Sequence, residues 1–150
     1  MVIRSLKNDE QPPWDLLLLA DPSEELVSAY LNDSFCYVAD LDNSVVGIIV
    51  LFPKSEDIIE VMNIAVSEYI QGKGIGSKLI KHGIEAAKEK GFKTVEIGTG
   101  NSSISQLALY QKAGFRIVGI DQDFFVRHYP EPIYEHGIQC RDMIRLSMQI

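Results

Sequence analysis

The alternation of apolar and polar positions along the chain predicts short strands and amphipathic helices in a mixed order. β-Branched and aromatic residues concentrate at residues 35–39, 45–52 and 58–66, and turn-forming residues separate the first two runs. We therefore expect three strands, the first two of which form a hairpin. Further strands are predicted at residues 2–6, 94–97, 115–120 and 143–148.

Helical periodicity is clearest at residues 75–90, where apolar side chains lie opposite lysines and Gly91 follows as a stop signal. A second such pattern covers residues 103–113 and ends at Gly114. Two shorter helices are expected at residues 14–20 and 21–30. The resulting order mixes a β-meander with strand–helix–strand crossovers. It predicts a mixed α/β fold in which helices cover the sheet.

The strand at residues 58–66 carries polar residues between apolar ones. Strict alternation places Glu60, Met62 and Ile64 on one face of the strand. Val61, Asn63 and Ala65 then share the other face.

Length and composition limit the class of protein. A chain of 150 residues that is 46% hydrophobic fills one core, so we expect a single domain, 1–150. The net charge of −7 argues against a nucleic-acid surface and weakly favours a cationic partner. No apolar run approaches the roughly 20 residues that cross a bilayer, and the N-terminus does not resemble a signal peptide.

Two distant cysteines, Cys36 and Cys140, suggest neither a disulfide framework nor a zinc site, and we expect both to be small apolar residues. A reducing, cytoplasmic location is therefore expected. No cluster of His, Cys and Asp has the spacing of metal ligands, so no metal is expected.

A glycine-rich turn joins the strand at residues 58–66 to the helix at residues 75–90. Gly72, Gly74 and Gly76 remove Cβ atoms where a ligand would approach the backbone, and the first amides of the following helix point outward. Such amides bind anions and could hold a pyrophosphate without a metal. A tight connection without a ligand gives the same pattern. The glycine spacing fits neither the P-loop nor the dinucleotide-binding fingerprint.

Two motifs in this order resemble the GNAT N-acetyltransferases. Residues 63–76 are similar to the family's acetyl-CoA signature Q/R-x-x-G-x-G/A, with Gln71, Gly74 and Gly76 at its three defined positions. Residues 109–115, with the sequence LYQKAGF, resemble the family's L-Y-x-x-x-G-F element, and Asn101 precedes them. The resemblance implies a mostly antiparallel sheet that splays between residues 58–66 and 94–99 and is flanked by about four helices. The pantetheine arm of acetyl-CoA would lie in that gap.

The resemblance also implies the residues that contact the cofactor. The backbone of Ile64 to Val66 would pair with the pantetheine arm, and a backbone N–H there would polarise the thioester carbonyl. Many family members have Asn where this chain has Ser103, so Asn101 and Ser103 both stay candidates for the cofactor contact. The implied cofactor-binding residues are Ile64, Ala65, Val66, Gln71, Gly72, Lys73, Gly74, Ile75, Gly76, Ser77, Asn101, Ser103 and Tyr110.

The implied reaction transfers an acetyl group from acetyl-CoA to a primary amine by direct attack in a ternary complex. Tyr110 matches the family's general acid, which protonates the departing thiolate. Glu60 resembles the family glutamate that removes a proton from the amine, and Glu96 competes for this role.

The implied acceptor is a small-molecule or peptide amine. A cationic acceptor suits residues 124–136, where aromatic residues are mixed with carboxylates. The alternative function is a catalytically silent module that senses acetyl-CoA. The patterns do not identify the acceptor amine. They also leave open whether the donor carries an acetyl or a longer acyl group and whether the protein forms a homodimer.

Overall fold

The computed structural model describes all 150 residues, which form two compact units. The first unit contains residues 1–95 and residue 150, and the second contains residues 96–149. In chain order the elements are β1 (Val2–Ser5), α1 (Trp14–Ala20), α2 (Glu24–Leu31), β2 (Phe35–Leu41), β3 (Ser44–Pro53), β4 (Ile58–Val66), the 3₁₀ helix η1 (Glu68–Ile70), α3 (Ile75–Glu89), β5 (Thr94–Gly100), α4 (Ile104–Ala113), β6 (Arg116–Asp121), α5 (Phe124–His128), β7 (Ile133–Glu135), β8 (Ile138–Cys140) and β9 (Met143–Gln149).

The first unit contains four antiparallel strands in the order β1-β2-β3-β4. The predicted hairpin of β2 and β3 is present. Its two-residue turn holds Asp42 and Asn43 at φ values of 52° and 67°, and such left-handed turns match the twist of the paired strands.

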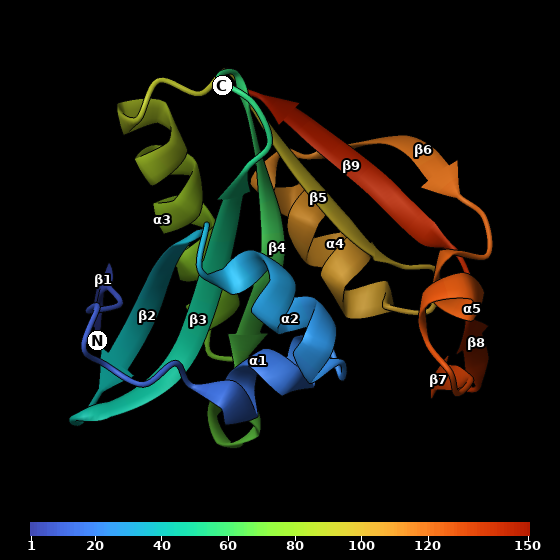
Figure 1. Cartoon of the computed structure of the whole chain (residues 1–150), viewed down its shortest axis with the longest axis horizontal. Helices are drawn as coiled ribbons and strands as arrows, with labels where there is room; N and C mark the ends of the chain where they lie inside the picture. Colours follow the sequence, from blue (N-terminus) through green and yellow to red (C-terminus); the bar gives the residue numbers. More distant parts are fainter. The chain divides into compact units, whose positions relative to one another are not determined.

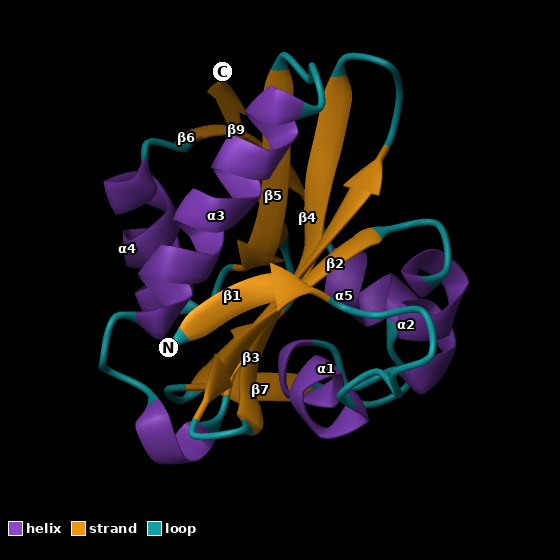
Figure 2. Ribbon diagram, turned by 90° about the vertical axis from the view of Figure 1, so that its left-hand side faces the viewer, coloured by secondary structure: helices purple, strands orange, loops and turns teal.

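Helices cover both faces of these four strands (Figures 1 and 2). On one face, α3 packs against Ile49 and Leu51, and a Cβ on Gly83 would lie only 2.9 Å from Ile49. On the other face, Leu16 and Leu17 of α1 and Val27 and Tyr30 of α2 form a buried cluster with Val38, Ile48, Val50 and Ala65. The two faces bury most of the aliphatic residues of β2 and β3.

A β-bulge in β4 corrects the predicted faces of that strand. Val50 of β3 pairs with Asn63, but the next residue, Leu51, pairs with Val61, so Met62 is the extra residue. Opposed residues share a face, and Met62 packs against the buried cluster beside α1 and α2. Glu60, opposite Phe52, therefore lies on the same face as Asn63, whereas Ile64, opposite Ile49, lies on the α3 face. Strict alternation gave the wrong partition because it cannot detect an inserted residue.

The second unit contains the strand order β5-β9-β6, with β6 and β9 antiparallel. Residues 121–141, between the last two predicted strands, contain the short helix α5 and the hairpin of β7 and β8. Sequence periodicity could not show these elements because each has only three to five residues. The fold is mixed α/β as predicted, with α5 added to the four expected helices.

Candidate functional site

The start of α3 has the geometry of an anion-binding turn. Gly72 and Gly74 adopt φ values of +83° and +80°, in the left-handed region that favours glycine. Gly74 is the N-cap of α3, and no side chain caps the helix or places a negative charge in its first turn. A Cβ added to either glycine would meet no atom within 4 Å, so the backbone of this turn is accessible.

The first amides of α3 are available to a ligand. The first N–H groups of a helix lack intrahelical partners, and here the amide of Lys78 is the one that returns to the carbonyl of Gly74, at 3.1 Å. Ile75 is buried against the core and fixes the direction of the helix, while Lys73 and Ser77 are exposed beside the turn. The helix dipole adds positive potential at this end. A diphosphate fits both the exposed amides and the sign of the charge.

Gln71 links this turn to the end of β4. Its side-chain amide donates a hydrogen bond to the carbonyl of Val66 at 3.1 Å. This contact holds the turn close to Ile64, Ala65 and Val66. These three residues pair with β3 along one edge of β4. The structure thus brings the predicted residues of β4 and of the glycine turn together within the first unit.

Glu60 lies near the start of β4, with its side chain only 13% exposed. Its carboxylate lies 3.5 Å from the ammonium group of Lys54. Glu60 shares a face with Asn63, and the ion pair gives this largely buried carboxylate a structural role.

Tyr110 is buried in the second unit, on α4. The residue is 3% exposed. Its ring meets the ring of Phe115 edge-to-face, with the ring centroids 6.3 Å apart. Burial raises the pKa of the Tyr110 phenol well above its ordinary value, so the hydroxyl keeps its proton at neutral pH. A phenol that keeps its proton is a hydrogen-bond donor, and it is able to stabilise a thiolate that forms beside it.

Asn101 joins two segments of the second unit. Its side-chain oxygen accepts hydrogen bonds from the amides of Arg141 and Asp142 at 2.8 and 2.9 Å. Its side-chain nitrogen donates to the carbonyl of Gln139 at 3.1 Å. These bonds hold the segment after β8 against the end of β5, a structural role that the sequence did not reveal.

Ser103, the other candidate for a cofactor contact, donates a hydrogen bond to Oε1 of Glu135 at 2.8 Å. The neighbouring Ser102 donates to the same oxygen at 3.2 Å. Sequence reasoning did not single out Glu135. The only signal was an acidic residue in an aromatic segment, and the pairing depends on the β7–β8 hairpin.

The cysteines are poor nucleophiles. Burial raises the pKa of the Cys36 thiol to about 11 and also raises that of Cys140. Both thiols therefore remain protonated at neutral pH. No group of three or more His, Cys, Asp and Glu side chains is arranged to hold a metal ion. None of the helices combines the length and apolar character needed to cross a bilayer.

An uncapped helix start behind a left-handed glycine, without acidic residues in the first turn, is typical of proteins that bind a phosphorylated ligand. Comparison with known proteins identifies its family. The profile described as "Acetyltransferase (GNAT) family" matches residues 3–115, so the chain belongs to that family.

Relatives support this assignment along nearly the whole chain. YvbK of Bacillus subtilis, described as an uncharacterized N-acetyltransferase, is 54% identical over 143 residues, which are 95% of this chain and 91% of the relative. A GNAT acetyltransferase from Elizabethkingia anophelis, solved with acetyl-CoA bound, is 49% identical, with a TM-score of 0.97 over 99% of this chain and 97% of that chain. A Bacillus cereus structure described as an IAA acetyltransferase is 53% identical, with a TM-score of 0.96 over 99% of both chains. The protein is thus an acetyl-CoA-dependent acetyltransferase with the GNAT fold.

Proposed function

We propose that this enzyme transfers the acetyl group of acetyl-CoA to a primary amine of a small molecule or peptide by direct attack. The observation that carries the proposal is the start of α3, where Gly74 opens an uncapped row of amides to an anion. In the proposal, the amides of residues 74–77 hold the diphosphate of the cofactor, with Lys73 beside them. The backbone of residues 64–66 pairs with the pantetheine arm like an added strand.

The chemistry needs one base and one acid. Glu60 removes a proton from the protonated amine, whose nitrogen lone pair then attacks the thioester carbonyl carbon. A backbone N–H of residues 64–66 stabilises the negative charge that develops on the carbonyl oxygen. When the carbon–sulfur bond breaks, Tyr110 donates its phenolic proton to the departing thiolate, and the products are the amide and coenzyme A.

Two observations support these roles. Tyr110 is buried, and its raised pKa keeps the proton in place. Glu60 is largely buried on a strand whose residues 64–66 belong to the predicted cofactor contacts. Glu96, the competing base, lies on β5 and is half-buried. The expected single domain, 1–150, and the cytoplasmic location stay predictions.

The test is an assay of thiol release from acetyl-CoA with a panel of amines, peptides and IAA as acceptors. We expect turnover with at least one primary amine and no thiol release when IAA is the sole acceptor. Tyr110→Phe should lower kcat about 100-fold, the usual range for loss of a general acid, with unchanged affinity for acetyl-CoA. Glu60→Gln should likewise lower kcat.

Tyr37→Phe is the matched control, because Tyr37 is also a buried tyrosine with a pKa raised by burial. It packs against His82 on the α3 face, and its replacement should leave kcat unchanged. Acetyl transfer only to oxygen acceptors, or full activity of Tyr110→Phe, would overturn the proposal.

A further inference from the structure

In the second unit, only one of the two carboxylate oxygens of Glu135 accepts hydrogen bonds from other side chains. Both hydrogen bonds from Ser102 and Ser103 end on Oε1, at 3.2 and 2.8 Å. Ser102 is fully buried and Ser103 is 8% exposed, so both donors are fixed by packing. Oε2 has no hydrogen-bond partner in the chain, and Glu135 itself is half-buried.

Close packing fixes this arrangement further. At the end of β5, a Cβ on Gly100 would clash with Sγ of Cys140 and would lie 3.6 Å from the ring of Phe125. Phe125 in turn stacks on Tyr129, with ring centroids 5.7 Å apart. Cys140, Phe125 and Ser103 therefore all lie close to Gly100, so the backbone before the serine pair is closely packed.

No cation of the second unit neutralises this carboxylate. Arg127 pairs with Asp121 at 2.8 Å, and Arg141 pairs with Asp123 at 3.0 Å. The guanidinium of Arg145 lies over the ring of Phe124. Oε2 is thus the oxygen of Glu135 to which the second unit supplies neither a charge nor a hydrogen bond, and a cationic ligand is able to supply both.

We propose that Oε2 of Glu135 binds a positively charged group of the acceptor, so that the preferred acceptors carry a second cation besides the amine that is acetylated. This inference rests on the proposed function. The nitrogen that attacks must be neutral, so the ammonium that pairs with a carboxylate is a different one. Diamines and longer cationic amines fit this requirement, and the net charge of −7 attracts them.

Ser102 and Ser103 act as positioning residues in this proposal. Two hydroxyl donors on Oε1 restrict the carboxylate to one orientation before the ligand arrives. Preorganisation of this kind reduces the entropy lost on binding. The serine pair also ties the β7–β8 hairpin to the start of α4, which is why the test must separate binding from stability.

The experiment compares two acceptors of equal length, 1,4-diaminobutane and n-butylamine, with wild-type enzyme and Glu135→Gln. We expect the wild type to prefer the diamine. The variant should lose about tenfold in kcat/KM for the diamine, the worth of one charge-assisted hydrogen bond. The loss should appear in KM, while kcat/KM for butylamine and the KM for acetyl-CoA should change less than about twofold.

Glu131→Gln is the matched control, since Glu131 is an exposed glutamate in the same segment and its loss removes the same charge. It should leave the diamine preference intact. If Glu135→Gln fails to fold, Ser103→Ala removes one of the two bonds to Oε1 and should lower the ratio of diamine to monoamine activity.

The outcomes are separable from those of the proposed function. Turnover of both amines without a preference for the diamine, or an equal loss on both amines in Glu135→Gln, would overturn this inference alone. Absence of turnover with every amine, despite acetyl-CoA binding, would overturn the proposed function and this inference together.

Discussion

The side-chain nitrogen of Asn63 on β4 lies 3.2 Å from the hydroxyl oxygen of Tyr30 on α2. The same nitrogen donates to the carbonyl of Leu17 on α1 at 3.0 Å. One amide group thus fastens both N-terminal helices to the strand that is predicted to contact the cofactor. Asn63 is only 3% exposed, and its side-chain oxygen is the one buried side-chain polar atom without a partner.

Asn63→Leu should destabilise the first unit by about 1 to 3 kcal/mol, because it removes the buried hydrogen bonds to the Tyr30 hydroxyl and to the carbonyl of Leu17, which keeps only the amide of Asp21 as a donor. Chemical denaturation followed by circular dichroism measures the change. Tyr30→Phe leaves the bond to Leu17 in place and should cost less, and the double variant gives the coupling between the two side chains. Equal stability of wild type and Asn63→Leu would show that the helices are held by apolar packing alone.

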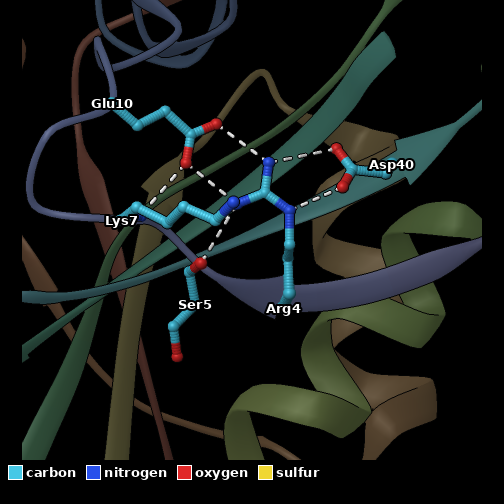
Figure 3. Close-up of polar contacts among 5 residues, drawn as sticks. All are labelled: Arg4, Ser5, Lys7, Glu10 and Asp40. Atoms are coloured by element: carbon cyan, nitrogen blue, oxygen red, sulfur yellow. Dashed lines mark hydrogen bonds and ion pairs between the residues drawn. The ribbon is translucent and has the colours of Figure 1, made fainter. Parts of the chain in front are cut away.

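A second polar cluster ties β1 to β2 (Figure 3). The guanidinium of Arg4 contacts Asp40 at 2.6 Å and Glu10 at 2.8 Å. The hydrogen bonds from Arg4 lower the pKa of Glu10 to about 2 and raise that of Arg4. Arg4 and Glu10 are accessible to water, so salt should weaken the ion pair between them.

This pKa shift gives a pH dependence. The folded pKa of Glu10, about 2, lies below its ordinary value of 4.5, so its contribution to stability is complete above pH 4.5 and is lost as the pH falls toward 2. Glu10→Gln should therefore be less stable than the wild type at neutral pH, with a difference that shrinks across that window. Denaturation at several pH values measures this difference. Glu56→Gln, which removes an exposed carboxylate without an ion pair, should show no such window.

The sequence predicted the features that depend on short-range patterns. The helix over residues 75–90 and its glycine turn follow from periodicity and from spacing, and the structure places them as α3 (Ile75–Glu89) behind Gly74. The contacts of Asn63 could not be predicted, because its partners lie 33 and 46 residues away in the chain. The faces of Glu60 and Met62 depended on a bulge that leaves no signal in the alternation. Glu135 needed the hairpin that folds it onto Ser102 and Ser103.

The two ends of α3 provide a matched test of the cofactor turn. Gly74 before the helix and Gly91 after it adopt φ values of +80° and +89°, and neither has an atom within 4 Å of an added Cβ. Alanine at either position should cost a similar amount, about 1 to 2 kcal/mol, because of left-handed strain. Only Gly74→Ala should weaken binding of coenzyme A, by about tenfold or more, since its Cβ and any relaxation of φ disturb the amides that face the diphosphate. Isothermal titration calorimetry measures both affinities, and equal affinities in the two variants would place the diphosphate elsewhere.

Asn101 allows a structural role to be separated from a cofactor contact. All three of its side-chain hydrogen bonds go to backbone groups of residues 139–142. Asn101→Ala should therefore lower the free energy of unfolding by about 1 to 3 kcal/mol, because the amides of Arg141 and Asp142 lose their acceptor. Its affinity for acetyl-CoA should change less than about twofold, since the side-chain oxygen already accepts two hydrogen bonds and the nitrogen already donates one within the chain. Ser105→Ala, at an exposed position on α4, is the control for stability. A tenfold loss of acetyl-CoA affinity in Asn101→Ala without a loss of stability would mean that the side chain exchanges its partners when the cofactor binds.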